Sequence, residues 1–284
     1  MTAAKSGHLR PSFFIIGANK CGTSSLYRYL LANPGVLPCA KKEPNFFGQH
    51  SADYIDRHID DYFALFPTCD YRGPLEFRWE ASDEAGASRP TTIVVDRRPD
   101  QYYITGEASA NTFHDVAPAL LHRYLPDVKL IVLVRNPVDR AYSHHRMYRR
   151  FSEAGHHLGI EIGDFDADIR AEMAAYERGE RTEYIGPGVY IDLLPGWITT
   201  YGADNVNVLV TEDLGQLQTV QQVMMELEEY LGLPAHDYAD ILARRFNRAP
   251  PADIPPHTRT LLAEFYRPLN ARLQDYLGRE LGWR

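Results

Sequence analysis

Short apolar runs alternate with segments of helical period along this chain, and this alternation limits the possible folds more than any other feature. The runs 13–16, 129–134 and 206–210 have the length and the continuous hydrophobicity of strands that are buried on both faces. Apolar residues recur at helical spacing at 26–31, 116–125, 137–148, 189–201, 219–231 and 257–277. Strands separated by helices form parallel sheets, because each helix returns the chain to the same edge of the sheet. The sequence therefore predicts an α/β fold of three layers, with a central parallel sheet flanked by helices.

Two stretches do not follow the alternation. Residues 74–104 contain the strand-like pieces LEFRWE, TTIVVD and QYYIT around a polar turn, which predicts a hairpin-like insertion. Residues 151–187 contain several glycines and a helix expected near 166–178, and we expect a variable loop there. Neither stretch is long enough for a separate domain, so we expect a single domain over residues 1–284.

The charge balance and the cysteines exclude several classes of function. Thirty Lys and Arg oppose 38 Asp and Glu, so the formal net charge is −8 and the chain lacks the positive field that binds nucleic acid. Any anionic ligand must therefore be held by a local cluster of basic groups. The three cysteines, Cys21, Cys39 and Cys69, have neither the number for a disulfide framework nor the spacing of zinc ligands, and we expect no metal site.

We expect no membrane-spanning segment and a cytoplasmic location. The longest apolar runs, such as 130–134, are far shorter than the roughly 20 residues that a membrane helix needs. Near the amino end, four large apolar residues stand together at 13–16, which is too few for the core of a signal peptide.

The turn GANKCGTSS, residues 17–25, connects the first predicted strand to the first helix. In that position unpaired backbone N–H groups and the helix dipole favour an anion, so the turn is a candidate phosphate cradle. A nucleoside-triphosphatase loop has lysine directly after its second glycine, whereas here Thr23 follows Gly22 and Lys20 precedes it by two residues. The next predicted strand is followed by Arg135 instead of a magnesium-binding aspartate. These residues argue against magnesium triphosphate; a P-loop kinase or nucleotide hydrolase stays an alternative.

Three longer motifs give a family resemblance. IIGANKCGTSSLYRYL resembles the 5′-phosphosulfate-binding loop of the sulfotransferases that use 3′-phosphoadenosine 5′-phosphosulfate (PAPS), and LIVLVRNPVDRAYSHH, within residues 129–150, resembles their 3′-phosphate-binding segment. KKEPNFF, residues 41–47 near the end of the segment 12–50, is similar to a motif of the carbohydrate, heparan-type branch. The resemblance runs in order from about residue 13 to residue 281. It implies a P-loop-like α/β fold and transfer of the sulfuryl group of PAPS to a hydroxyl of a sugar, small molecule or natural product.

The resemblance also implies roles for single residues. Lys20 would neutralise the charge that develops on the oxygen between the phosphate and the departing sulfuryl group. Glu43 would be the general base that removes the proton of the acceptor hydroxyl. The donor would be bound by Lys20, Gly22, Thr23, Ser24 and Ser25 at the 5′-phosphosulfate, and by Arg135, Ser143 and Arg248 at the 3′-phosphate. No metal is required in principle, since the transferred group carries less negative charge than a γ-phosphoryl group.

Plainer interpretations stay open for several of these residues. Thr23 and Ser24 are also suitable helix caps, and Glu43, which follows two lysines, is also typical of a solvated loop. Phe46 and Phe47 would form either a wall of the site or part of the core. In a variant of the mechanism one of three histidines would replace Glu43 as the base: His114, His144 or His145.

One motif departs from the family pattern. The family often has Glu-Lys-(Ser/Thr)-x-x-Tyr-Phe where this chain has Glu107-Ala108-Ser109-Ala-Asn-Thr112-Phe113. Ala108 replaces a lysine that faces anionic acceptors in glycosaminoglycan enzymes, which argues against a heparan-like polyanion as the acceptor. A non-catalytic relative that binds a nucleotide or a glycan is the third hypothesis, and the sequence leaves the acceptor and the oligomeric state open.

Overall fold

The computed structural model of the chain describes residues 7–70, 74–82, 88–96, 102–157, 159–215, 217–242 and 253–283. Its strands are β1 (Phe13–Gly17), β2 (Val36–Leu37), β3 (Pro74–Ser82), β4 (Ser88–Asp96), β5 (Ile104–Ala108), β6 (Lys129–Val134) and β7 (Val206–Val210). Its α-helices are α1 (Thr23–Leu30), α2 (Phe46–Gln49), α3 (Ala52–Phe63), α4 (Thr112–Asp115), α5 (Pro118–Tyr124), α6 (Pro137–Glu153), α7 (Phe165–Glu177), α8 (Tyr190–Tyr201), α9 (Leu217–Leu231), α10 (Ala239–Leu242) and α11 (Pro256–Leu277). Short 3-10 helices occur at Gly186–Gly188, Ala203–Asn205 and Thr211–Gly215.

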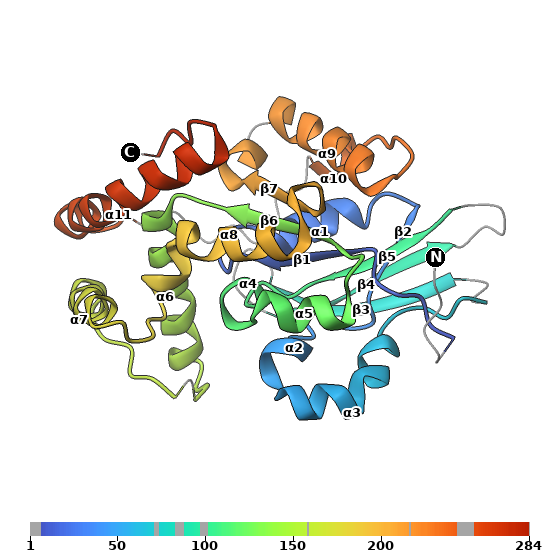
Figure 1. Ribbon diagram of the computed structural model, residues 1–284, viewed down its shortest axis with the longest axis horizontal. Coiled ribbons are helices and arrows are strands. Elements are labelled where there is room, and N and C mark those ends of the chain that lie inside the picture. The colour runs from blue at the N-terminus through green and yellow to red at the C-terminus, as the bar shows by residue number, and fades with distance from the viewer. Residues whose placement is uncertain are drawn as a thin grey trace.

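Five strands form one parallel sheet in the order β2–β5–β1–β6–β7 (Figure 1). β1 lies in the middle, with Phe13 opposite Gly106 of β5 and Lys129 of β6. Every residue of β1 is buried, and so is every residue of β6 except its first, as unbroken apolar runs predict for strands that are covered on both faces. The predicted α/β fold with a central parallel sheet is confirmed.

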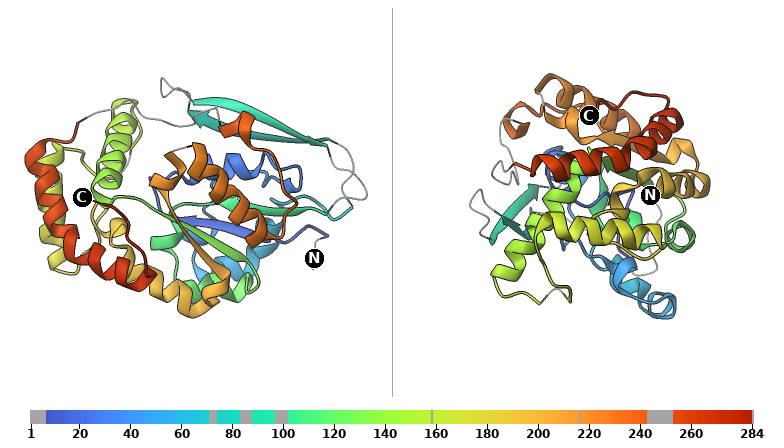
Figure 2. Two further views of the ribbon diagram at one scale, coloured as in Figure 1. Left: turned by 90° about the horizontal axis from the view of Figure 1, so that it is seen from above. Right: turned by 90° about the vertical axis from the view of Figure 1, so that its left-hand side faces the viewer.

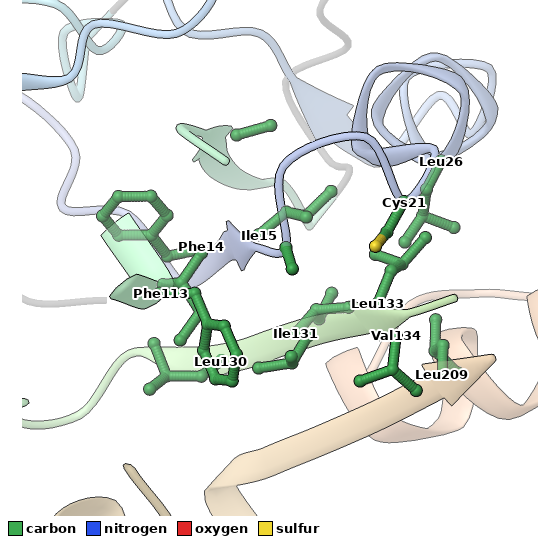
Figure 3. Close-up of a cluster of buried hydrophobic side chains, with 14 of the residues drawn as sticks. Phe14, Ile15, Cys21, Leu26, Phe113, Leu130, Ile131, Leu133, Val134 and Leu209 are labelled. Atoms are coloured by element: carbon green, nitrogen blue, oxygen red, sulfur yellow. The ribbon is translucent and has the colours of Figure 1, made fainter. Parts of the chain in front are cut away.

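The core is packed closely around β1. Gly106 of β5 approaches β1 so closely that a Cβ atom there would lie 2.4 Å from the carbonyl oxygen of Phe13, which excludes any side chain. Figure 3 shows Leu133 of β6 beside Leu26 of α1 and Cys21 of the turn between β1 and α1. The apolar core therefore extends to the base of that turn and supports it from below.

Helices cover both faces of the sheet (Figures 1 and 2). α1 and α9 lie on one face, and the Asn33 amide that follows α1 donates a hydrogen bond of 3.0 Å to Glu228 of α9. α5 and α8 lie on the other face, where the Trp197 indole donates to the carbonyl of Phe113 at 3.0 Å. None of the helices in the described ranges combines the length and the hydropathy of a membrane span.

α6, α7 and α11 stand together beyond the carboxyl end of β6 (Figure 1). Asn136 caps α6, its side chain accepting a hydrogen bond of 3.0 Å from the Val138 N–H. The helix continues to Glu153, past its predicted end near 148, because neither glycine nor proline interrupts it before Gly155, which has a φ of 82°. α6 thus reaches from the edge of the sheet into the first three residues of the segment predicted to be a variable loop, 151–153.

β3 and β4 form an antiparallel pair outside the main sheet, with Pro74 opposite Asp96. The insertion predicted at 74–104 is too long at its carboxyl end, because Ile104 begins β5 and lies opposite Val36 in the main sheet. The piece QYYIT therefore leads into the central sheet and is not part of the hairpin. The prediction is wrong here because β5 is short and contains a glycine and a glutamate, so it lacks the apolar run of the other central strands.

Candidate active site

The β1–α1 turn, residues 18–22, holds Lys20 and Gly22 at positive φ values of 69° and 90°. Gly22 is the N-cap of α1 and makes no side-chain hydrogen bond to the helix, so backbone N–H groups of the first turn lack an intrahelical acceptor. Thr23 and Ser24 are the first two helical residues, and the alternative that they cap the helix is therefore wrong. Such N–H groups at a helix start bind anions, and this geometry suits a phosphate group.

Contacts from three strand ends fasten the β1–α1 turn. The Ala18 N–H donates a hydrogen bond of 2.8 Å to the carbonyl of Leu133 in β6. The hydroxyl of Thr211, which follows β7, lies 2.6 Å from the carbonyl oxygen of Cys21 and 3.0 Å from that of Val134. The turn is thus tied to β6 and β7 as well as to β1, at the sheet edge where α/β proteins bind ligands.

Arg135 lies against this turn. Its guanidinium Nη1 donates a hydrogen bond of 3.1 Å to the carbonyl of Lys20. Its backbone is held by Tyr190 of α8, whose hydroxyl donates to the Arg135 carbonyl at 2.9 Å and accepts from the Arg135 N–H at 3.3 Å. The structure therefore brings the predicted residues Lys20 and Arg135 together, and the guanidinium has further donors for an anion.

One face of α6 continues the site. Ser143, Met147 and Arg150 are spaced i, i+4 and i+7 and so share this face, on which Ser143 is half-buried and Arg150 is exposed. The Nζ of Lys20 lies 3.2 Å from the thioether sulfur of Met147, which is a weak acceptor. Sequence reasoning identified Ser143 but missed Met147 and Arg150, although their spacing from Ser143 on a predicted helix was a usable signal.

The charge around Lys20 is predominantly positive. Burial, together with the nearby guanidinium groups of Arg150 and Arg135, lowers the pKa of the Lys20 ammonium to about 8, while Glu43 acts in the opposite direction. A lysine in this setting is stabilised in its charged form by an added anion. The site therefore has the electrostatic character of an anion-binding site.

The second predicted catalytic residue lies in the Glu43 turn, residues 43–45. Glu43 and Asn45 have φ values of 50° and 51°, and with Lys20 they are the residues other than glycine at positive φ in the described part of the chain. Each such residue costs about 1–3 kcal/mol and persists where the surroundings enforce it. The Glu43 carboxylate lies 3.2 Å from the Lys42 ammonium, is 37% exposed, and acts electrostatically on Lys20. The structure thus brings both predicted catalytic residues into one site.

The two phenylalanines after this turn are core residues. Phe46 and Phe47 are 9% and 3% exposed, and both rings pack on Tyr62 of α3, with centroid distances of 5.3 and 4.9 Å. Of the two interpretations offered by the sequence, the structure supports the core. Their packing anchors α2 and therefore fixes the carboxyl end of the Glu43 turn.

The three histidines offered as alternative bases are held in ways that disfavour proton uptake. Burial, with Arg140 and Lys20 nearby, lowers the pKa of His144 to about 2. Burial lowers the pKa of His114 to about 4, against the influence of Asp115. Burial also lowers the pKa of His145, although Asp168, 3.1 Å away, acts in the opposite direction. Glu43 is the better placed candidate for the base.

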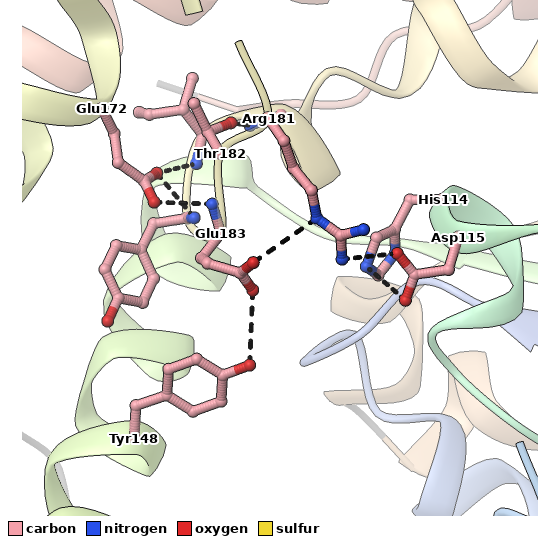
Figure 4. A network of polar contacts seen from close by, with 10 residues as sticks. His114, Asp115, Tyr148, Glu172, Arg181, Thr182 and Glu183 are labelled. Atoms are coloured by element: carbon pink, nitrogen blue, oxygen red, sulfur yellow. Dashed lines mark hydrogen bonds and ion pairs between the residues drawn. The ribbon is translucent and has the colours of Figure 1, made fainter. Parts of the chain in front are cut away.

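A polar network fixes the carboxyl end of the variable loop predicted at 151–187 (Figure 4). Glu172 of α7 accepts hydrogen bonds from the successive backbone N–H groups of residues 183–185, at 2.6, 2.7 and 2.8 Å. Arg181 contacts Asp115 of α4 at 2.8 Å. This end of the loop is therefore held beside α4.

Two predictions are not decided by this geometry. Arg248, together with the neighbouring Arg244 and Arg245, lies outside the described residues. Within the described ranges no three His, Cys, Asp or Glu side chains gather as a metal site would require, and the absence of a metal in the reaction stays a prediction.

Comparison with known proteins gives the family. The model of the sulfotransferase family matches residues 11–194, which include the β1–α1 turn, the Glu43 turn and Arg135. The chain belongs to this family. Two sulfotransferases of Homo sapiens are similar to it: carbohydrate sulfotransferase 15 is 25% identical over 315 residues, and bifunctional heparan sulfate N-deacetylase/N-sulfotransferase 3 is 24% identical over 298 residues. The alignments cover 95% and 94% of this chain but only 54% and 30% of the relatives, so the chain spans about half of the first protein and a third of the second.

Solved sulfotransferase structures share the fold. The sulfotransferase from Alicyclobacillus acidocaldarius superposes with a TM-score of 0.66 at 24% identity, covering 96% of this chain and 97% of the other. The sulfotransferase STF9 from Mycobacterium avium superposes with a TM-score of 0.50 at 12% identity, covering 97% of this chain and 79% of the other. The predicted P-loop-like sulfotransferase fold is confirmed.

Proposed function

We propose that this protein is a PAPS-dependent O-sulfotransferase. The observation that carries the proposal is the juxtaposition of Lys20, Arg135 and Glu43 around the amino end of α1. PAPS has two anionic ends, and the site offers two basic side chains, Lys20 and Arg135. Lys20 and the first turn of α1 suit the 5′-phosphosulfate, while Arg135 and Ser143 suit the 3′-phosphate.

Two side chains would carry the reaction. Glu43 accepts the proton of the acceptor hydroxyl while that oxygen forms its bond to sulfur. Lys20 stabilises the charge on the phosphate oxygen as its bond to sulfur breaks, so it acts where charge develops. The products are adenosine 3′,5′-bisphosphate (PAP) and a sulfate ester, and Glu43 returns its proton to solvent. We propose that the cation cluster around Lys20 makes a divalent metal unnecessary.

We propose a carbohydrate hydroxyl as the acceptor group. The names of the relatives, a carbohydrate sulfotransferase and a heparan sulfate N-sulfotransferase, support this class. Two features of this chain bear on how much negative charge the acceptor sugar carries. Ala108 is buried in β5 and supplies no basic group, whereas Lys42 and Arg150 place positive charge beside Glu43 and Lys20. A neutral or singly charged sugar suits this balance better than a dense polyanion.

The proposal is tested first by PAP binding and then by turnover. We expect saturable binding of PAP in the presence of EDTA, measured by calorimetry. We then expect transfer of label from radioactive PAPS to glycans or to alcohols in a metabolite extract, with the product identified by mass spectrometry. Magnesium-dependent ATP turnover without PAP binding would instead favour the kinase alternative, and PAP binding without transfer to any acceptor would favour a non-catalytic relative.

The role of Glu43 is tested by Glu43→Gln. We expect kcat to fall by roughly 10²- to 10⁴-fold because the amide cannot accept the proton, while PAP affinity is unchanged. Asp53→Asn is the control, since Asp53 is an exposed acid in the first turn of α3. A Glu43→Gln enzyme with a near-normal rate would transfer the role of base to another group.

A further inference from the structure

A buried chain of hydrogen bonds leads from the end of β5 to the Glu43 turn. The Ser109 hydroxyl donates a bond of 2.5 Å to Glu107 Oε2, and its oxygen accepts a bond of 3.0 Å from the backbone N–H of Asn45. The Tyr62 hydroxyl donates to the other carboxylate oxygen of Glu107 at 2.8 Å. Glu107 and Ser109 are both fully buried, so neither contacts solvent.

The turn needs such an external anchor. Glu43 and Asn45 both have left-handed backbone, which asparagine tolerates better than most residues but glutamate adopts only where its surroundings enforce it. The Asn45 side chain in turn donates a hydrogen bond of 3.1 Å from Nδ2 to the carbonyl oxygen of Glu43. Residue 45 is therefore the link: Ser109 holds its backbone, and its side chain holds the backbone of Glu43.

The spacing of the two buried residues follows from strand geometry. Side chains two positions apart lie on the same face of a strand, so Glu107 and Ser109 point the same way and Ala108 points to the other face. The departure from the family pattern at Ala108 therefore leaves this chain of hydrogen bonds intact. Burying a carboxylate is costly, and an apolar residue of similar size would stabilise a core strand better. The presence of a buried carboxylate at Glu107, near the carboxyl end of β5, points to a task other than stability.

We propose that Ser109, oriented by Glu107, is a positioning residue that holds the proposed base Glu43 in its catalytic conformation by fixing the backbone of Asn45. The inference rests on the proposed function, because it takes Glu43 as the base. Glu107 and Ser109 touch neither substrate nor reacting atoms in this account. Their effect on the reaction passes entirely through the Glu43 turn.

The test is a double-mutant cycle of Ser109→Ala with Glu43→Gln. In the native background we expect Ser109→Ala to lower kcat by about 10- to 100-fold, because the proton acceptor is displaced from the acceptor hydroxyl. The Kd for PAP should stay within about twofold, since the β1–α1 turn is not touched. In the Glu43→Gln background the same substitution should change kcat by less than about twofold, since no base is left to position. A merely structural loss would instead lower kcat equally in both backgrounds.

Thr105→Val is the matched control. Thr105 is also fully buried in β5, and its hydroxyl donates a hydrogen bond of 2.8 Å to the carbonyl of Leu37 in the neighbouring strand. Its replacement removes one buried hydroxyl from the same strand without touching residue 45. We expect a comparable loss of thermal stability with kcat unchanged. Should Ser109→Ala yield no protein that binds PAP, Glu107→Gln takes its place in the cycle with the same expected pattern.

Three results would overturn the inference. One is a kcat for Ser109→Ala within twofold of the native enzyme while Glu43→Gln is strongly impaired, which leaves the proposed function standing. Another is a loss of kcat that does not depend on Glu43: either Ser109→Ala lowers kcat equally in both backgrounds, or Thr105→Val lowers kcat as much as Ser109→Ala does. The last is normal activity of Glu43→Gln, which removes the proposed base together with the inference.

Discussion

The β1–α1 turn and the Glu43 turn solve the same problem in different ways. Each presents a charged side chain from left-handed backbone, at Lys20 and at Glu43. The first is tied to β6 and β7 and is surrounded by more charge of its own sign, from Arg150 and Arg135. The second is tied to the end of β5 and carries a charge that is already paired with Lys42.

This difference shows where each turn obtains its stabilisation. The surplus of positive charge at the β1–α1 turn is only partly offset by Glu43 and is relieved further by a bound anion, so ligand binding should change its energetics strongly. The Glu43 turn is satisfied by the protein itself, so ligand binding should change it little. Substitutions at the first turn should therefore affect donor binding and rate together, and those at the second should affect rate alone.

The largest effect is expected for Lys20→Ala. Removal of the ammonium should lower kcat by about 10²- to 10³-fold, as for the loss of a group aimed at developing charge. PAP affinity should fall as well, because the amine also contributes to binding of the 5′-phosphate. Lys41→Ala is the control, since Lys41 is an exposed lysine near the Glu43 turn. A Lys20→Ala enzyme with normal kcat in steady-state kinetics and intact PAP binding would contradict the difference proposed between the two turns.

A pH titration sharpens the comparison. Burial lowers the pKa of Lys20 to about 8, so half of the free enzyme loses this charge near pH 8. A bound anion stabilises the ammonium and raises its pKa, so PAP binding should take up a proton and weaken as pH rises, approaching about tenfold per pH unit above pH 8. Calorimetry in buffers of different ionisation enthalpy measures the uptake.

Lys20→Arg is the control for this titration. A guanidinium stays charged throughout the range, so PAP affinity in this variant should be nearly independent of pH between 7 and about 9.5. The same pH dependence in the native and variant proteins would assign it to a group other than Lys20.

The smallest effect is expected from two tyrosines of α8. Tyr190→Phe leaves the backbone N–H and carbonyl of Arg135 without their partner, so the free energy of unfolding should fall by about 1–3 kcal/mol and PAP affinity by a few-fold. Tyr201 is also buried, but its hydroxyl has no partner among the described residues, so Tyr201→Phe should be neutral or slightly stabilising. Denaturant unfolding of the pair measures the difference, and equal losses would show that Tyr190 does not support Arg135.

The sequence predicts those parts of the fold that are buried on both faces. β1, β6 and β7 and the helices around them follow from unbroken apolar runs and helical period. β2 has only two residues, and β5 carries a glycine and a buried glutamate, so neither has a strand pattern of its own. α3 buries Ile55, Tyr62 and Phe63 on one face at helical spacing, so its helical period was a usable signal that sequence reasoning missed.

The candidate site is predictable where residue type and chain position suffice. The glycine turn and the residue after β6 have fixed places in such a fold, and these placed Lys20 and Arg135 in one site in advance. The neighbours that set their electrostatics, Met147 and Arg150, depend on the exact course of α6. The hydrogen bonds of Ser109 depend on where a loop far away in sequence returns to the sheet, which no local pattern contains. The metal-free reaction and the cytoplasmic location stay predictions.

The left-handed backbone at Lys20 and Glu43 has a consequence for how this chain changes under selection. Glycine adopts that conformation without steric cost, but it has neither amine nor carboxylate. A lineage selected for heat resistance while sulfation is required must therefore retain both strained positions and gain stability elsewhere. Once the proposed sulfuryl transfer is no longer under selection, glycine at either position should stabilise the chain. The residues at positions 20 and 43 therefore indicate whether a descendant keeps the activity.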